Sequence, residues 1–233
     1  MASSGFIGEF PAGDLPARPA FCRVETGGAN RASWRPFPRE FAMTLQLSPD
    51  KAILIPIDVQ EGFDLSPAGG SNNPHAATNG LRLLAAWRDT GLPVIHVRHD
   101  SVAPGSRFAP GQSGNALRAG FEPRTGEVLV TKSVNAAFIG TDLDLRLRRL
   151  GIEQVVLFGM ITDMCVSTTA RVAANLGYRV VVVGDACTSF DLPDADGSLL
   201  PAELIHRAHL ATLRAEFGQV AEVDEVVAAI TVG

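Results

Sequence analysis

The chain has 233 residues, of which 46% are hydrophobic and 19% are charged, and its formal net charge is −5. This composition is typical of one globular domain with a full core, and the net negative charge argues against a nucleic-acid partner. The longest apolar runs have the length of strands, so the sequence predicts no membrane span.

Residues 1–42 differ from the rest of the chain. They are rich in Pro, Gly, Ser and Arg, have no sustained period, and lack the apolar segment of a signal peptide. We interpret them as a disordered, leader or fusion extension, because Met43 lies directly before the periodic region. Residues 43–233 are then the folded domain.

From Met43 onward, apolar runs alternate with helical patterns, as in an α/β protein with a parallel sheet. Strands are predicted at 52–58, 92–99, 127–132, 154–160, 178–186 and 219–223. Helices are predicted at 75–91, at 141–151, from Cys165 to Asn175, and at 201–218. Pro56 is unusual for a central strand, because proline cannot donate to the ladder. Residues 100–126 form a long Gly/Pro-rich segment, and such loops are usually functional or disordered.

Three residues with complementary chemistry follow the predicted strands. Asp58 closes the first strand, Lys132 closes the third, and Cys165 opens the helix after the fourth. In parallel sheets these ends meet at one edge, where ligands bind. A buried cysteine packs as a small hydrophobe, whereas a thiol at a helix N-terminus ionises more easily.

The three residues together favour the chemical interpretation. Asp58 can take the thiol proton if burial raises its pKa, and Lys132 can balance the charge. The first N–H groups of the helix can hold an oxyanion. This arrangement implies acyl transfer to sulfur, followed by hydrolysis with water. The chain's three cysteines, Cys22, Cys165 and Cys187, are too few and too widely spaced to support a disulfide framework, which favours a reducing cytoplasm.

Six motifs carry a specific resemblance. They are IDVQEGF (57–63), HVRHDS (96–101), TKSVNAAFIGTDL (131–143), GMITDMCVSTTARVAANLGY (159–178), VVVGDACTSF (181–190) and the spaced His and Leu residues of 206–213. Over about residues 50–225 the chain resembles the isochorismatase-like cysteine hydrolase superfamily, which includes nicotinamidases and N-carbamoylsarcosine amidohydrolases.

The resemblance implies a three-layer αβα sandwich around a six-stranded parallel sheet. It assigns Asp58, Lys132 and Cys165 to a catalytic triad that works through a thioester. It also implies a cis peptide bond between Met160 and Ile161, with the N–H groups of Ile161 and Cys165 forming the oxyanion hole. Because relatives are usually oligomers, we expect a homo-oligomer, either a dimer or a tetramer.

Two departures from relatives narrow the function. Nicotinamidases hold a metal with an Asp-x-His motif and a further histidine, whereas this chain supplies His96, His99 and Asp100 in a different arrangement. We therefore expect no metal and no other cofactor. Isochorismatases that cleave a vinyl ether do not use the cysteine, so Cys165 favours hydrolysis of a C–N bond.

Five further residues are candidates for substrate binding. They follow the motif residues in sequence and are Gln60, Phe63, His99, Asn135 and Phe138. Each also has a structural interpretation, such as turn packing for the first two. His206 and His209 lie on the last predicted helix, where a surface or interface position is more common.

Three functions stay open at this point. The first and preferred one is a metal-free cysteine amidohydrolase that acts on a small amide, ureido or cyclic amide substrate. The second is a vinyl ether hydrolase of the isochorismatase type, for which Cys165 would be dispensable. The third is a non-catalytic binder of small molecules on the same scaffold. The sequence does not identify the substrate.

Overall fold

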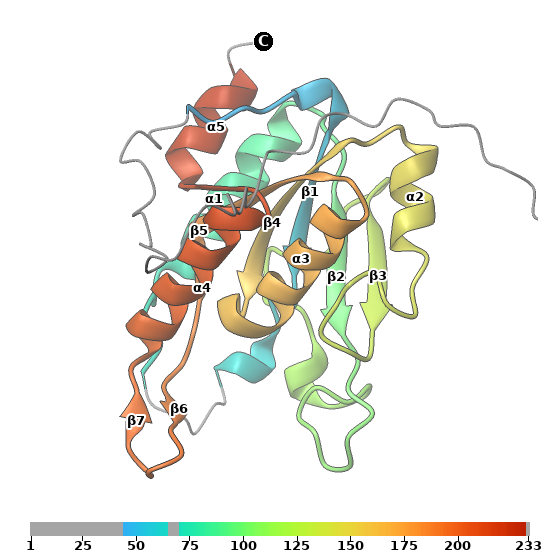
Figure 1. Ribbon diagram of the computed structural model, residues 1–233. Helices are drawn as coiled ribbons and strands as arrows, with labels where there is room; N and C mark the ends of the chain where they lie inside the picture. The colour runs from blue at the N-terminus through green and yellow to red at the C-terminus, as the bar shows by residue number, and fades with distance from the viewer. Residues whose placement is uncertain (1–43, 65–69, 232–233) are drawn as a thin grey trace, which may run out of the picture. The chain divides into compact units, whose positions relative to one another are not determined.

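The computed structural model describes residues 44–64 and 70–231, so the predicted extension 1–42 lies outside the described residues. The described part contains a six-stranded sheet, ordered β3-β2-β1-β4-β5-β8, in which neighbouring strands are parallel (Figure 1). Its strands are β1 (Ala52–Ile57), β2 (Ile95–His99), β3 (Val128–Lys132), β4 (Gln154–Met160), β5 (Arg179–Thr188) and β8 (Gln219–Ala221). The predicted six-stranded parallel sheet is confirmed.

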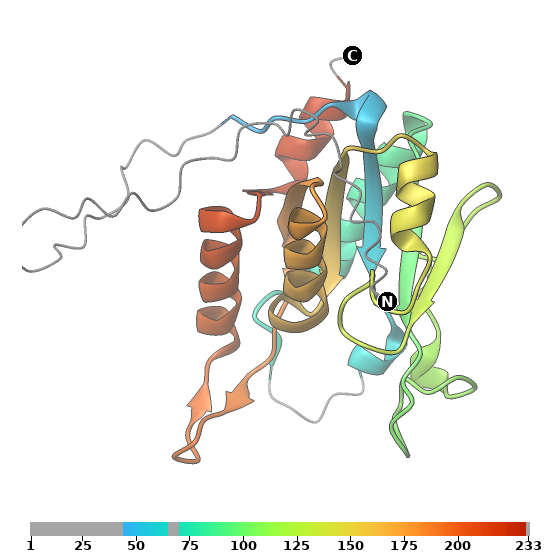
Figure 2. The same cartoon turned by 45° about the vertical axis from the view of Figure 1, so that its right-hand side comes forward.

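Helices cover both faces of the sheet, which gives the predicted αβα sandwich. Helices α2 (Leu143–Arg149), α3 (Ser167–Asn175) and α4 (Ala202–Glu216) lie on one face, and α1 (Ala76–Asp89) and α5 (Val223–Thr231) lie on the other (Figures 1 and 2). Every residue of β1 and β4 is buried, as expected for parallel strands with helices on both sides. No helix within 44–64 or 70–231 has the length and apolar character needed to span a bilayer.

Pro56 is tolerated in the central strand β1 because the N–H that proline lacks would point toward β2, so only the pairing with β2 loses a hydrogen bond. The N–H groups of Leu54 and Asp58 donate to Pro93 and Val97, on the side that faces β2. Pro56 lies between them and faces the same way, so only Ile57 pairs with β2 in the ladder. The β4 side is unaffected, and all six residues of β1 pair there.

Gly159 allows β1 and β4 to approach each other closely beside the predicted site. Its φ is +137°, a conformation that favours glycine. A Cβ at this position would lie 2.0 Å from the carbonyl oxygen of Ile57, the residue before Asp58.

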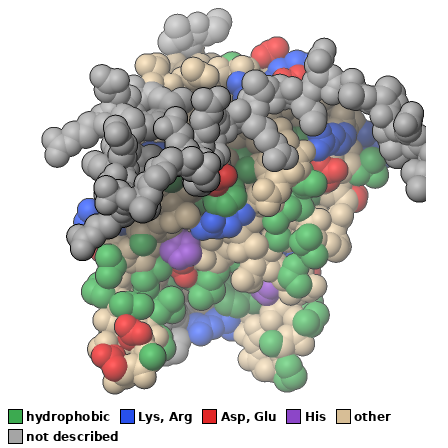
Figure 3. Space-filling model, in the orientation of Figure 1, with side chains coloured by type: hydrophobic (Ala, Val, Ile, Leu, Met, Phe, Trp, Pro, Cys, Tyr) green, Lys and Arg blue, Asp and Glu red, His purple; other side chains and the backbone are tan. Residues whose placement is uncertain are grey.

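Two projections extend the sheet edge at which the parallel strands end (Figure 1). One is the long segment 100–127, which contains a short helix at Ser113–Asn115. The other is the antiparallel pair β6 (Leu192–Pro193) and β7 (Leu199–Leu200), which the sequence pattern did not predict. Figure 3 shows a notch between them, with Lys or Arg side chains visible inside it.

Candidate active site

Cys165 lies in a π-helical turn, Thr162–Val166, between β4 and α3. The carbonyl oxygen of Ile161 closes this turn by accepting hydrogen bonds from the N–H groups of Met164 (3.3 Å) and Val166 (3.2 Å). The α-helix itself begins at Ser167, two residues later than the sequence pattern predicted. Such π turns are rare and are frequent at functional sites.

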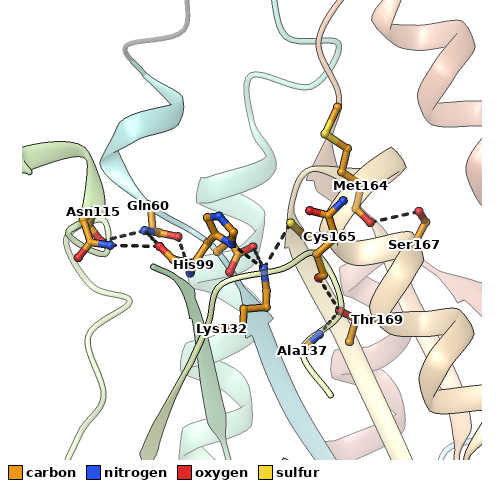
Figure 4. Close-up of polar contacts among 11 residues, drawn as sticks. Gln60, His99, Asn115, Lys132, Ala137, Met164, Cys165, Ser167 and Thr169 are labelled. Carbon is orange, nitrogen blue, oxygen red and sulfur yellow. Dashed lines mark hydrogen bonds and ion pairs between the residues drawn. The ribbon is translucent and has the colours of Figure 1, made fainter. Parts of the chain in front are cut away.

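Lys132 links the other two members of the predicted triad. It is the last residue of β3, and its side chain is fully buried. Its Nζ lies 2.5 Å from Asp58 Oδ2, 3.4 Å from Cys165 Sγ and 3.5 Å from His99 Nδ1 (Figure 4). A lysine ammonium has three N–H groups, so each of them has a partner in this arrangement.

Asp58 directly follows β1 in a left-handed conformation, with φ +51°. This conformation is uncommon for residues other than glycine, although Asp and Asn adopt it more readily than most. The backbone N–H of Asp58 donates to Val97 and its carbonyl accepts from Gln60, which holds the residue in place. Its Oδ1 is buried and has no hydrogen-bond partner in the described part of the chain. This oxygen is therefore free to accept a proton.

The charges in this site are set mainly by burial. Burial raises the pKa of Asp58, and the neighbouring Lys132 opposes part of that rise. Burial, together with the charge of Asp58, also raises the pKa of Cys165 to about 12. Burial therefore opposes the easier ionisation that a helix N-terminus would give this thiol, because desolvation outweighs the attraction of Lys132. The raised affinity of Asp58 for protons agrees with its expected role as a base.

The peptide bond between Met160 and Ile161 is cis, at the position that the resemblance implied. Ile161 follows β4 directly and precedes the π turn that contains Cys165. The assignment of the Ile161 and Cys165 N–H groups to an oxyanion hole remains a prediction.

Gln60 does not face a substrate, contrary to our expectation. It is fully buried, and its amide is occupied by backbone groups. Its Nε2 donates to the carbonyls of His99 (3.0 Å) and Asn115 (2.9 Å), and its Oε1 accepts from the N–H of His99 (2.9 Å) (Figure 4). Gln60 therefore fixes the end of β2 beside the site.

Phe138 packs against a core aromatic residue, and its assignment to the pocket wall stays a prediction. It is buried in the core and stacks on Tyr178, with the ring centroids 6.0 Å apart. Tyr178 lies just before β5, at the end of the strand remote from the site. The side chain of Phe138 thus packs against the aromatic residue that precedes β5.

The other pocket candidates lie near the sheet edge. Phe63 is half-buried, and its ring centroid lies 4.7 Å from that of Phe108 and 6.3 Å from that of Phe190. It borders a pocket of about 250 Å³ together with Arg118 and Phe190. Asn135 is exposed in the loop after Lys132. Both residues remain candidates for substrate binding, and His99 contacts Lys132 directly.

Sequence reasoning missed a buried contact that holds the π turn. His206 was expected at the surface or in an interface, but it is buried and its Nδ1 lies 2.8 Å from Thr162 Oγ1. The Thr162 hydroxyl donates to the carbonyl of Thr188, so the imidazole must donate to the hydroxyl. This contact ties the turn that carries Cys165 to α4. The position of His206 in the sixth motif was the available signal.

His96, His99 and Asp100, which lie where nicotinamidases carry their metal motif, do not form a metal site. His96 Nε2 lies 2.8 Å from Glu127, Asp100 accepts hydrogen bonds from Arg98 and Asn115, and His99 Nδ1 faces Lys132. Within the described ranges, no three His, Cys, Asp or Glu side chains gather in a way that could hold an ion.

Comparisons with known proteins identify the family of this chain. The isochorismatase domain model matches residues 52–225. The isochorismatase family protein YrdC of Bacillus subtilis is 38% identical over 76% of this chain and 95% of its own. Ureidoacrylate amidohydrolase RutB of Variovorax paradoxus is 27% identical over 91% of this chain and 96% of its own. A crystal structure assigned to the isochorismatase family of hydrolases, from Chromobacterium violaceum, superposes with a TM-score of 0.77 at 41% identity, over 82% of this chain and 98% of that one. The chain therefore belongs to the isochorismatase family of hydrolases.

Proposed function

We propose that this protein is a cysteine hydrolase that cleaves a C–N bond of a small amide, ureido or cyclic amide without a metal ion. The observation that carries the proposal is the position of Lys132 Nζ, within hydrogen-bond reach of both Asp58 Oδ2 and Cys165 Sγ. A buried lysine between a thiol and a carboxylate supports a charge-balanced nucleophile, which a purely structural cysteine does not need.

The proposed mechanism begins with a protonated thiol, because the pKa of Cys165 is about 12. As Sγ attacks the carbonyl carbon, the thiol proton passes to Asp58, whose Oδ1 has no other partner in the described residues. The C–N bond then breaks, and protonated Asp58 gives its proton to the leaving nitrogen. Water next attacks the thioester and loses a proton to Asp58. Breakdown of this intermediate returns that proton to sulfur, which releases the acid and restores the site.

Cys165 and its contacts favour C–N bond hydrolysis over cleavage of a vinyl ether. A vinyl ether does not present an acyl carbon for attack by sulfur, so a Lys132–Cys165 contact would have no use in that reaction. A relative that is an amidohydrolase by name, RutB, supports the same choice.

The decisive experiment is a screen of small amides, ureido compounds and lactams for release of ammonia or amine. We expect at least one substrate to be hydrolysed, with activity lost in Cys165→Ala and retained in Cys187→Ala. Cys187 is the matched control because it is a second buried cysteine and lies outside the predicted triad. Full activity of Cys165→Ala would contradict the thioester route, and hydrolysis of a vinyl ether alone would support the alternative function.

A further inference from the structure

His99 is placed beside Lys132 by the register of the sheet. The two residues are directly paired across β2 and β3, so their side chains lie next to each other on one face. His99 Nδ1 lies 3.5 Å from Lys132 Nζ. An ammonium group can only donate hydrogen bonds, so Nδ1 must be the unprotonated nitrogen and Nε2 must carry the proton.

Buried amides hold the backbone of His99 on both sides. Gln60 accepts from the N–H of His99, and both Gln60 and Asn115 donate to its carbonyl oxygen. The ring of Phe108 meets the imidazole edge-on, with centroids 6.4 Å apart. The imidazole therefore has a defined position relative to Lys132 (Figure 4).

We propose that His99 is a positioning residue, which as a neutral imidazole accepts one hydrogen of Lys132 and so directs the other two toward Asp58 and Cys165. The inference rests on the proposed function in one respect, that Lys132 serves the chemistry of Cys165. This positioning role replaces substrate binding, the role first expected for His99. The positioning role also explains why Gln60 and Asn115 converge on the His99 backbone.

The charged groups around His99 agree with a neutral imidazole. Burial and the nearby Lys132 lower its pKa, while Asp58, Asp100 and the carbonyl of Val134 oppose that change. Protonation of His99 would remove the acceptor and place a second positive charge beside Lys132. Activity supported by this contact should therefore be lost as the pH falls through the His99 pKa, which lies below its ordinary value.

The protonation state can be tested by ¹⁵N NMR of the histidine rings, with the His99 signals identified by their loss in His99→Gln. We expect His99 to be neutral near neutral pH, with the proton on Nε2. In Lys132→Met the preference for this tautomer should weaken and the pKa should rise. A proton on Nδ1, a charged ring at neutral pH, or no response to Lys132→Met would overturn the proposal.

The effect on the thiol can be tested with iodoacetamide, which needs no substrate. At about pH 8, His99→Leu should slow alkylation of Cys165 about tenfold, the lower end of what one hydrogen bond to a charged group contributes. His99→Gln supplies an acceptor oxygen and should restore most of this loss. His75→Gln, at an exposed histidine, is the matched control.

Peptide-resolved mass spectrometry separates Cys165 from the other cysteines in this assay. If Leu and Gln at position 99 behave alike, His99 only fills space and the proposal is wrong. Because neither readout requires turnover, a protein that responds as expected but hydrolyses no amide would disprove the proposed function and leave the His99 inference standing. If the protein hydrolyses amides but shows neither response, the His99 inference is wrong and the proposed function stands.

Discussion

Asp58 and Lys132 form an ion pair that is almost completely removed from water. Breaking such a pair by changing one partner leaves a buried charge without compensation and costs more than losing an exposed pair. The pair therefore matters for stability, independently of its proposed role in catalysis.

Asp58→Asn should lower kcat/KM at least about 10²-fold, because it removes the group that transfers the proton. Asparagine tolerates the left-handed backbone of this position, yet the variant should also lose about 3 kcal/mol of stability through the unpaired Lys132. Thermal unfolding and steady-state kinetics measure the two effects separately.

The double variant Asp58→Asn/Lys132→Met is the control for this prediction. It removes both charges, so it should recover much of the lost stability while it stays inactive. Recovery of activity in the double variant would show that Asp58 does not transfer the proton.

With a pKa of about 12, Cys165 should react with iodoacetamide slowly near neutral pH, and its rate should rise about tenfold per pH unit up to about pH 10. Cys187 has the same raised pKa but no exposed surface, whereas 9% of Cys165 is exposed, so Cys165 should react first. A rate that is already constant above neutral pH would mean that the thiolate forms without a substrate.

At the scale of elements, the π turn depends on a hydrogen-bond chain from β5 through Thr162 to α4. Thr162 is fully buried, and its hydroxyl both donates to Thr188 and accepts from His206. The position of Cys165 is therefore set by an element more than 40 residues later in the chain.

Thr162→Val keeps the shape of the side chain but removes the hydroxyl. The carbonyl of Thr188 and the imidazole of His206 then lose their partner, so we expect a loss of about 1–3 kcal/mol of stability and a lower kcat. Thr212→Val is the matched control, because Thr212 is exposed on α4 and bonds only within its helix. Equal behaviour of the two variants in unfolding and kinetic assays would argue against this contact.

At the scale of the whole molecule, residues Met43–Gly233 form one compact unit. Within it, the buried side chain of Gln154 accepts from the N–H of Ser48 and donates to the carbonyl of Gln46. Residues 46–48 thus contribute to the domain, because they satisfy a buried amide.

A chain shortened to begin at Met43 should keep its melting temperature and its activity. A chain that begins at Pro49 is the matched comparison, and it should be less stable by about 1–3 kcal/mol because Gln154 loses both partners. Calorimetry of the two shortened chains measures this difference in stability. A large loss on removing only residues 1–42 would show that they stabilise the domain.

A chelator gives the second test at this scale. The potential ligands His96, His99 and Asp100 all have other partners, so we expect activity to survive treatment with EDTA. About one metal ion per chain in elemental analysis, lost together with activity, would contradict a metal-free mechanism.

The sequence by itself determined the sheet and the three residues at its edge. Long apolar runs mark buried parallel strands whatever packs on them, and the carboxyl ends of such strands meet at one edge. The positions of Asp58, Lys132 and Cys165 relative to their strands were therefore sufficient to place the three residues together. The pair β6–β7 was missed because two-residue strands leave no periodic pattern.

The tertiary structure alone decided what surrounds those residues. Burial is a property of the packed molecule, so the raised pKa of Cys165 could not be inferred from its neighbours in sequence. Gln60 and Phe138 also follow members of the predicted triad in the chain, yet one bonds the backbone of another strand and the other stacks on Tyr178. Proximity in sequence fixes neither the direction of a side chain nor its partners, because both depend on strands that the chain reaches only later.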